Sequence, residues 1–365
     1  MTLMTLVYLA AGLVLLVVGA EILVRGASKL AALFGISPLV IGLTVVAFGT
    51  SAPETAVSVQ AALSGSGDLA LGNVIGSNIA NVLLILGLAA LIAPLTVSRQ
   101  LIRLDVPIMI GVSLLAWGLA ANGSLGRIDG ALLFLGVVLY TAFMVVSSLR
   151  SSRSEAAADD ATGTTAAATD SGGRRSWLRH PVFIVAGLVL LVTGSDFLVT
   201  GATTLALALG LSELVIGLTV VAVGTSLPEL ATSILAAIRG ERDIAVGNVV
   251  GSCIFNLLCV LGLSALVAPQ AIAVSTASLA FDFPVMVAVS LACLPIFFTG
   301  FRIERWEGAL FVAYYVAYTA YLVLFSTGQS AADALGHAML FYVLPLTAVT
   351  LAVLGIRALG ASRRA

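Results

Sequence analysis

The sequence predicts an all-α polytopic membrane protein with two inverted five-helix repeats and one extra C-terminal transmembrane helix, about 11 spans in all. Three observations predict this fold class: an apolar composition, long apolar runs at regular intervals, and an internal repeat. Hydrophobic residues make up 60% of the 365 residues and charged residues 10%, whereas soluble domains average about 45–50% and about 25%. This composition excludes a soluble enzyme, a disordered chain and a nucleic-acid-binding protein, which needs a basic surface.

Each apolar run is long enough to cross a bilayer as a helix, which takes about 20 residues. The first run lacks a positively charged start and a small-residue cleavage site, so we expect a helix rather than a signal peptide. The predicted spans cover residues 3–24, 38–63, 69–93, 101–121, 128–149, 181–207, 213–238, 244–268, 276–299, 307–326 and 336–358.

The spans divide the chain into four parts. Residues 1–149 form the first repeat and 181–326 the second, with five spans each. Residues 150–180 are polar, charged and rich in Ser, Ala and Gly, which predicts a cytoplasmic linker with a disordered middle. Residues 327–365 hold the additional span and a cytoplasmic C-terminus.

Lysine and arginine predict the orientation, because cytoplasmic loops carry an excess of them. With the N-terminus outside, all of the 17 basic residues except Arg127 fall on the cytoplasmic side. The chain is therefore expected in the inner (plasma) membrane of a cell, with its N-terminus outside and its C-terminus in the cytoplasm.

The repeat is visible in two motifs. Residues 42–54 read GLTVVAFGTSAPE and residues 217–229 read GLTVVAVGTSLPE, identical at 11 of 13 positions at an offset of 175. At the same offset, GNVIGSN at 72–78 matches GNVVGSC at 247–253. Because each repeat has an odd number of spans, the second copy enters the membrane from the opposite side. Inverted repeats are typical of secondary transporters that bind their cargo near the midplane, between the copies.

Glu54 and Glu229 are the strongest candidate site residues. A charged group inside a bilayer costs at least about 2.5–3.5 kcal/mol and needs a reason. Each follows Gly-Thr-Ser-x-Pro, and the proline frees the carbonyl four residues back, at Gly49 or Gly224. We therefore expect each helix to unwind there, so that carbonyls, Thr and Ser hydroxyls and a carboxylate converge. Hard cations such as Ca²⁺ and Na⁺ prefer such oxygen ligands.

The second motif adds polar stripes to otherwise apolar helices. Ser77 and Asn81 are four residues apart and share a helix face, as do Ser252 and Asn256. We interpret these four as ion-lining residues, although small and amide residues also hold membrane helices together. For Asn73 and Asn248 both interpretations stay open.

The remaining polar features predict structure rather than chemistry. Glu21 with Arg25, and Asp105 with Arg103, are expected to form interfacial ion pairs, and the roles of Asp196 and Asp282 stay open. The three cysteines lie in apolar runs and are expected to be free packing residues. No nucleotide-binding motif is present. The protein is therefore not expected to be an enzyme, to bind a cofactor or to use a nucleotide.

The paired motifs, GTSAPE with GNVIGSNIAN and GTSLPE with GNVVGSCIFN, resemble the two alpha-repeats of the calcium/cation antiporter superfamily, nearest its prokaryotic sodium/calcium exchanger branch. The resemblance covers about residues 1–326. It implies a ten-helix core in which spans two, three, seven and eight enclose the ions, and alternating access by sliding of spans one and six. It implies that the ion ligands are Glu54, Glu229, Thr50, Ser51, Ser77, Asn81, Thr225, Ser226, Ser252 and Asn256, with the main-chain carbonyls of Ala47 and Ala222.

This chain departs from the family pattern at two positions. Asn256 stands where some sodium/calcium exchangers have Asp, so the pocket has two carboxylates, and Cys253 stands where the first repeat has Asn78. The sequence thus predicts an antiporter that exports cytosolic Ca²⁺ against Na⁺. The alternatives are a Ca²⁺/H⁺ antiporter using the same two glutamates and, from another class, a cation channel. The expected partners are these ions and the lipid bilayer.

Overall fold

The computed structural model describes residues 3–162, 179–208, 222–298, 300–326, 335–337 and 339. The described chain is helical apart from short strands and turns. Eight of its helices are long and apolar enough to cross a membrane, and a ninth span results if the bent pair Pro38–Thr50 and Ala52–Leu63 is counted as one. These nine match nine of the predicted spans. The start of the predicted span 213–238 and nearly all of 336–358 lie outside the described residues.

The first half begins with α1 (Leu3–Phe34), which is longer than the predicted span. The helices α2 (Pro38–Ile41), η1 (Gly42–Val46), α3 (Ala47–Thr50) and α4 (Ala52–Leu63) follow as one bent rod, in which η marks a π-helical segment. Next come α5 (Gly67–Ala80), η2 (Asn81–Leu86) and α6 (Gly87–Ile92), then η3 (Leu101–Asp105) with α7 (Val106–Ala120), and α8 (Arg127–Thr162).

The second half repeats this order with α9 (Arg179–Ala208), α11 (Ala222–Thr225) and α12 (Leu227–Arg239). It continues with α13 (Arg242–Phe255), η5 (Asn256–Leu261) and α14 (Gly262–Val267), then η6 (Ser278–Asp282), α15 (Phe283–Phe298) and α16 (Arg305–Ser326).

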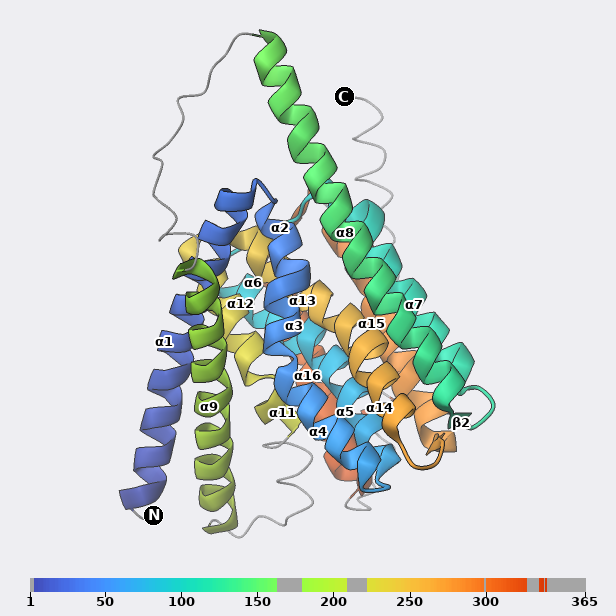
Figure 1. Cartoon of the computed structure of the whole chain (residues 1–365). Coiled ribbons are helices and arrows are strands. Elements are labelled where there is room, and N and C mark those ends of the chain that lie inside the picture. Colours follow the sequence, from blue (N-terminus) through green and yellow to red (C-terminus); the bar gives the residue numbers. More distant parts are fainter. Residues whose placement is uncertain are drawn as a thin grey trace.

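The helix α8 differs from the expected linker boundary. It continues to Thr162, into the segment predicted to be a solvated linker. Residues 150–162 contain no Gly or Pro and several Ala residues, so nothing in their composition ends the helix. Figure 1 shows this part of α8 extending beyond the body of the molecule. Residues 163–178 of the predicted linker lie outside the described residues.

Four short strands join the two halves. β1 (Leu95–Thr96) pairs antiparallel with β4 (Arg302–Ile303), and β2 (Ser124–Leu125) pairs with β3 (Ile272–Ala273). β1 and β3 occupy matching positions in the two halves, as do β2 and β4. Each strand therefore pairs with a strand of the other half that is not its own repeat counterpart. Exchanging the two halves turns one pairing, β1 with β4, into the other, β3 with β2.

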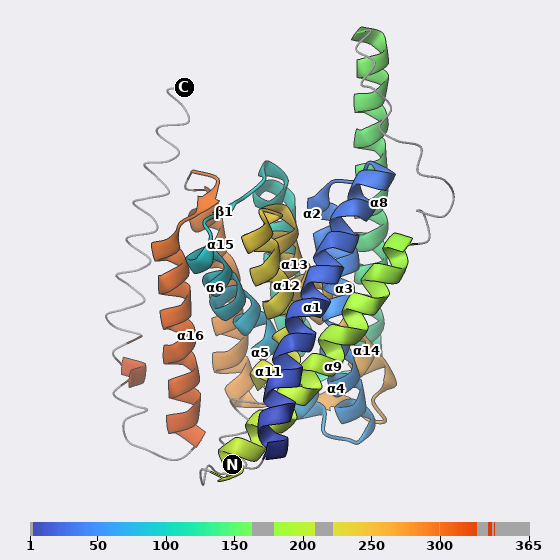
Figure 2. The same ribbon diagram turned by 90° about the vertical axis from the view of Figure 1, so that its left-hand side faces the viewer.

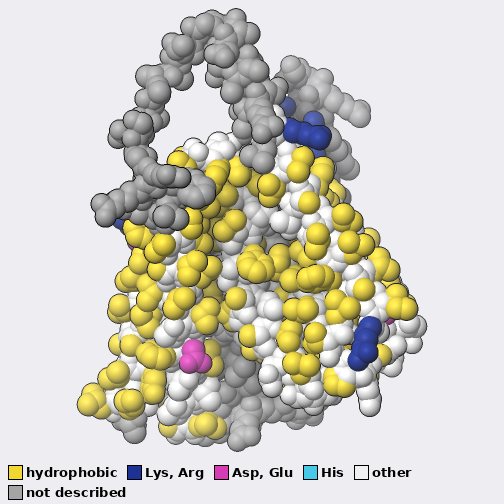
Figure 3. Space-filling view, in the orientation of Figure 1, with side chains coloured by type: hydrophobic (Ala, Val, Ile, Leu, Met, Phe, Trp, Pro, Cys, Tyr) yellow, Lys and Arg dark blue, Asp and Glu magenta, His cyan; other side chains and the backbone are white. Residues whose placement is uncertain are grey.

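The helices α1 and α9 lie side by side at one edge of the molecule and cross the body obliquely (Figures 1 and 2). Their backbones approach closely at glycines: a Cβ atom on Gly19 would lie 2.9 Å from the Gly187 carbonyl oxygen. Small residues at such crossings allow membrane helices to pack backbone to backbone. Hydrophobic side chains cover much of the outer face between the two ends (Figure 3), as a lipid-facing surface requires.

Candidate functional site

Each glutamate motif lies at a break in its helix. α3 and α4 meet at Ser51 with a bend of 46°, and α11 and α12 meet at Ser226. The ψ angles of these two serines are 10° and 9°, outside the helical range. The predicted interruption is confirmed, but each break is one residue long rather than an unwound stretch, because the following proline fits the first turn of the next helix.

The Gly224 carbonyl oxygen, which Pro228 leaves without its helical donor, accepts a hydrogen bond from a side chain. The hydroxyl of Ser195 on α9 donates a hydrogen bond to the Gly224 carbonyl oxygen at 2.5 Å. The position matching Ser195 in the first half is Ala20, which has no hydroxyl to donate. The break in the second half is therefore tied to α9 by a contact that the first half cannot make.

The two breaks face each other. The hydroxyl of Ser51 donates to Glu229 Oε1 at 3.0 Å, and the hydroxyl of Ser226 donates to Glu54 Oε1 at 2.9 Å. Both glutamate side chains are fully buried. Each carboxylate is thus held by the serine of the opposite half, and the two GTSxPE motifs form one site.

Asn73 and Asn248 make matching hydrogen bonds to the threonine of the opposite motif and to a serine of their own half. Asn248 accepts from the Thr50 hydroxyl at 3.1 Å and donates to Ser233 Oγ at 3.0 Å. In the other half, Asn73 accepts from Thr225 at 3.5 Å and donates to Ser58 Oγ at 2.9 Å. Ser58 and Ser233 were missed by the sequence reasoning. Their signal is their spacing, one helical turn after each glutamate.

Six buried side-chain oxygens of the predicted residues have no hydrogen-bond partner, and three come from each half. They are Glu54 Oε2, Ser77 Oγ, Asn81 Oδ1, Glu229 Oε2, Ser252 Oγ and Asn256 Oδ1. Nearly all buried polar atoms in proteins are paired, so six unpaired oxygens at matching positions need an explanation. A hard cation coordinated by six to eight oxygens, at about 2.3–2.6 Å, provides one.

The predicted main-chain ligands Ala47 and Ala222 each begin a short helix, α3 and α11. The Ala47 carbonyl oxygen already accepts from the Ser51 amide at 3.1 Å and from the Thr50 hydroxyl at 3.4 Å. Ala222 is the first residue of α11. The asparagines Asn81 and Asn256 are the first residues of the π-helical segments η2 and η5. Such π-helical turns are frequent at functional sites, and nothing in the sequence reasoning anticipated them.

The other four acidic residues that the sequence places within or beside the spans form no hydrogen bond to Glu54 or Glu229 among the described contacts. Glu21 does pair with Arg25, as predicted, and its two carboxylate oxygens also accept from Arg239 of α12 at 2.9 and 2.6 Å. The predicted Asp105–Arg103 pair is wrong. Residues two apart on a helix face different directions, and Asp105 is buried, where it accepts from Gln100 at 3.4 Å and Tyr140 at 3.5 Å.

Asp196 is exposed and Asp282 is half-buried. Across the described ranges, no group of three or more His, Cys, Asp or Glu residues could hold a metal ion. The three cysteines are free and buried, as expected. The site therefore combines two carboxylates with neutral oxygens, unlike a zinc site built from nitrogen and sulfur.

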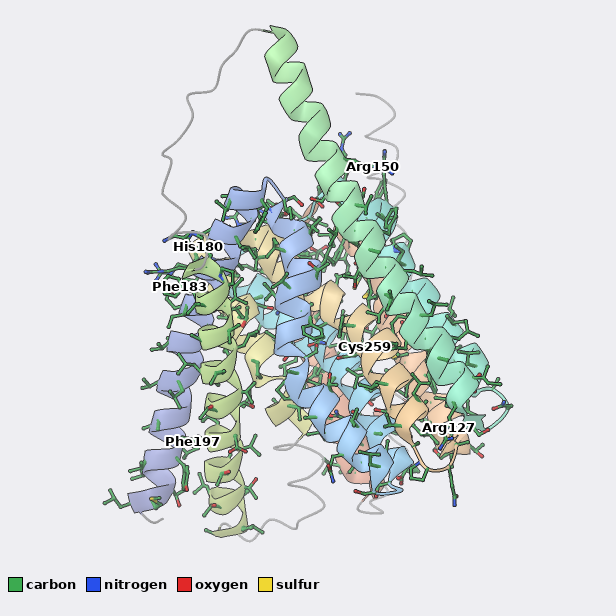
Figure 4. All side chains as sticks on the ribbon, viewed as in Figure 1. Arg127, Arg150, His180, Phe183, Phe197 and Cys259 are labelled. Carbon is green, nitrogen blue, oxygen red and sulfur yellow. The ribbon has the colours of Figure 1, made fainter. Side chains whose placement is uncertain are left out.

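Labelled basic residues lie at both ends of the molecule along the direction of the helices. Figure 4 shows Arg150 and His180 at one end and Arg127 at the other. The N-terminal end of α1 lies at the same end as Arg127. The breaks that precede Glu54 and Glu229 lie between these ends.

Comparison with known proteins identifies the family. The model of the family described as "Sodium/calcium exchanger protein" matches residues 4–147 and 179–324. CaxA of Alkalimonas amylolytica is 42% identical over 86% of this chain and 96% of its own length. The inner membrane protein YrbG of Escherichia coli is 42% identical over 78% of this chain and 85% of its own.

Two further matches carry the exchanger name. The sodium/calcium exchanger MaX1 of Methanosarcina acetivorans is 35% identical over 85% of this chain and 96% of its own length. A solved structure of the sodium-calcium exchanger NCX_Mj has a TM-score of 0.74 and 32% identity, and covers 88% of this chain and all of its own. With both family segments matched and the two paired breaks in place, this chain belongs to the sodium/calcium exchanger family.

Proposed function

We propose that this protein is a secondary antiporter that exports cytosolic Ca²⁺ in exchange for Na⁺. The observation that carries the proposal is the set of six unpartnered buried oxygens, two of them carboxylate oxygens of Glu54 and Glu229. No described lysine, arginine or histidine forms an ion pair with either carboxylate. Buried charges are normally paired with an opposite charge or bind a metal ion, so two buried carboxylates without a basic partner favour cations as their partners.

The charge of the site accounts for the coupling. One Ca²⁺ neutralises two carboxylates, and so do monovalent ions bound in its place. Because both ions use Glu54 and Glu229, they cannot occupy the site together. An empty site would bury two unpaired negative charges at large cost, so the empty protein resists the change between its two states. Exchange follows, because only loaded states convert readily.

We infer that the two halves are inverted repeats that alternate access to this site. Reciprocal pairing supports this inference: Ser51 holds Glu229 as Ser226 holds Glu54, and β1 pairs with β4 as β2 pairs with β3. The proposed topology has 11 spans in the inner membrane, with the N-terminus outside and the linker and C-terminus in the cytoplasm. The placement of Arg127 opposite Arg150 and His180 agrees with it.

A Ca²⁺/H⁺ antiporter is the second candidate. Full burial of both glutamates without a basic partner favours it, since protons could neutralise the pair in place of Na⁺. A cation channel is the candidate from a different class. Two reciprocal breaks in opposed halves fit alternating access better than a continuous pore, and a channel would pass Ca²⁺ without any opposing ion.

One experiment separates the three candidates. Purified protein is reconstituted into liposomes, and ⁴⁵Ca²⁺ uptake is measured with an outward Na⁺ gradient, then with an outward H⁺ gradient, then with neither. The proposal expects uptake with Na⁺ alone. Uptake driven only by the H⁺ gradient would establish the second candidate, and uptake without a counter-ion would indicate a channel.

The carboxylates provide the first prediction. Glu54→Gln and Glu229→Gln keep the side-chain size, and an amide oxygen can still accept from Ser226 or Ser51, but the negative charge is lost. We expect each variant to insert and fold yet to lose gradient-driven ⁴⁵Ca²⁺ uptake. Glu241→Gln, in a half-buried residue outside the site that accepts from Ser28, is the matched control and should retain uptake. Normal uptake by either site variant would remove that glutamate from the site.

A further inference from the structure

One asparagine beside the site has both of its polar atoms engaged. Asn78 lies on α5 and is buried. Its Nδ2 donates to the main-chain carbonyl oxygen of Cys253 on α13 at 3.2 Å, and its Oδ1 accepts from Asn256 Nδ2 at 3.2 Å. Its Nδ2 also lies 3.7 Å from the sulfur of Met286. Both polar atoms of Asn78 thus bond to protein groups, and one of these groups is the predicted ligand Asn256.

The Cys253 carbonyl fixes the orientation of two amides in turn. A carbonyl oxygen can only accept, so the Asn78 atom that faces it must be the NH₂ group. The oxygen of Asn78 then faces Asn256, which must present its own NH₂ group. Asn256 is thereby turned so that its Oδ1 points the other way, where it is buried and has no partner.

The first half lacks this arrangement. The position that matches Asn78 is Cys253, and the position that matches Asn256 is Asn81. Neither amide atom of Asn81 has a hydrogen-bond partner. A thiol is a weak donor and a weak acceptor, so it cannot fix an amide as a carboxamide does. The two asparagines are therefore unequal: a carboxamide orients Asn256, whereas the corresponding neighbour of Asn81 is the Cys253 thiol.

We propose that Asn78 is a positioning residue that presents the Asn256 Oδ1 to the transported cation. This inference rests on the proposed function. A reversed Asn256 would offer the cation an NH₂ group, which repels it, in place of an oxygen. Asn78 thus holds the Asn256 oxygen toward the cation, whereas no carboxamide orients Asn81 in the same way.

The test begins with Asn78→Leu, which keeps the side-chain size and removes both polar atoms, and Asn78→Ala as a second variant if the leucine is not accommodated. Mutation of a residue that hydrogen-bonds to a metal ligand typically lowers metal affinity by about 10- to 100-fold. We expect a rise of that size in the half-saturating Ca²⁺ concentration for ⁴⁵Ca²⁺ uptake. Ser113→Ala, which removes a buried hydroxyl that donates to the Met109 carbonyl oxygen within α7, is the control and is expected to leave this concentration unchanged.

An aspartate at position 256 separates positioning from a structural role. In Asn256→Asp both side-chain atoms are oxygens, so orientation no longer matters and the Asn78 oxygen repels the new carboxylate. Asn78→Leu should then change the half-saturating Ca²⁺ concentration by no more than about twofold, or lower it. The proposal is overturned if Asn78→Leu raises the half-saturating Ca²⁺ concentration equally in the natural and the Asn256→Asp backgrounds. It is also overturned if Asn78→Leu leaves both this concentration and the thermal stability of the natural protein unchanged. Glu54→Gln is measured alongside: unchanged half-saturation in that variant would refute the site itself, whatever Asn78 does.

Discussion

At the scale of residues, the site is defined by hydrogen bonds that cross between halves. Ser51 and Ser226 each occupy one oxygen of the opposite glutamate, at 3.0 and 2.9 Å. The second oxygen of each carboxylate stays unpartnered. The serines therefore orient the carboxylates and, at the same time, tie the breaks of the two bent helices together.

We expect Ser51→Ala and Ser226→Ala to weaken Ca²⁺ binding to a similar extent, because the two contacts are equivalent. A loss of about tenfold in half-saturating Ca²⁺ corresponds to about 1.4 kcal/mol, close to the low end for a hydrogen bond to a charged group. Concentration series of ⁴⁵Ca²⁺ uptake measure it. Ser64 is an exposed serine at the C-terminal end of α4, the helix that follows Ser51. The control Ser64→Ala should behave as the natural protein. A large effect of one site serine without the other would contradict the equivalence.

The charge of the site predicts the electrical behaviour of transport. Glu54 and Glu229 give a formal charge of −2, which one Ca²⁺ or two monovalent ions neutralise. A third Na⁺ would sit among neutral ligands, at a desolvation cost that no carboxylate offsets. We therefore expect exchange closer to electroneutral than a three-for-one cycle.

Proteoliposomes clamped at potentials of opposite sign test this expectation. Calcium flux in the natural protein should depend weakly on voltage, and Asn256→Asp should alter that dependence by adding a third carboxylate. Strong voltage dependence in the natural protein, unchanged in the variant, would show that position 256 does not set the charge balance.

The repeated motifs predicted the helix breaks, which the structure confirms, and named both glutamates and the four hydroxyl and amide residues of the stripes as candidate ligands. The partners across the halves could not be, because spacing along a chain gives only which residues share a helix face. Ser58 and Ser233 were missed for this reason, and Asn78 was named only as the match of Cys253, without its contacts across the halves. Asp105 was assigned to Arg103 because they are close in sequence, whereas the tertiary structure buries it beside Tyr140.

At the scale of elements, prolines and glycines predicted where the helices break, but not the π-helical segments that begin at Asn81 and Asn256. Such segments arise from packing and leave no compositional signal. The close helix crossings could not be predicted from composition either. α8 crosses α14 where a Cβ atom on Gly130 would lie 2.7 Å from the Gly262 carbonyl oxygen, and α16 crosses α6 where one on Gly308 would lie 2.6 Å from that of Gly87.

We expect Gly130→Ala to destabilise the protein, because the new methyl group would meet main-chain atoms that cannot turn away. Overpacking of this kind costs about 1–3 kcal/mol. Gly111→Ala on α7 is the matched control: no atom lies within 4 Å of its Cβ position, and alanine favours the helix. Thermal unfolding in detergent should show a lower midpoint for Gly130→Ala only, and equal midpoints would mean that the crossing relaxes at little cost.

At the scale of the whole molecule, charge predicts which end faces the cytoplasm. Arg127 and the N-terminal end of α1 lie at one end, and Arg150 and His180 lie at the other. The hydrophobic runs predicted the spans because the bilayer imposes a minimum length on each. The eleventh span was predicted from hydropathy and supported by the distribution of lysine and arginine, and it decides on which side the chain ends.

Cysteine labelling in intact cells tests this topology directly. The natural cysteines are all buried, at 7% exposure or less, so a membrane-impermeant maleimide should find little background. Arg127 and Arg150 are exposed. We expect Arg127→Cys to be labelled in intact cells, and Arg150→Cys and Arg364→Cys only after permeabilisation, since an odd number of spans separates the N-terminus from both. Labelling of Arg364→Cys in intact cells would remove the eleventh span, whereas labelling of Arg150→Cys but not Arg127→Cys would invert the protein in the membrane. The orientation of the protein determines which end of the site opens to the cytoplasm. It therefore also determines the direction in which Ca²⁺ moves past α1 and α9.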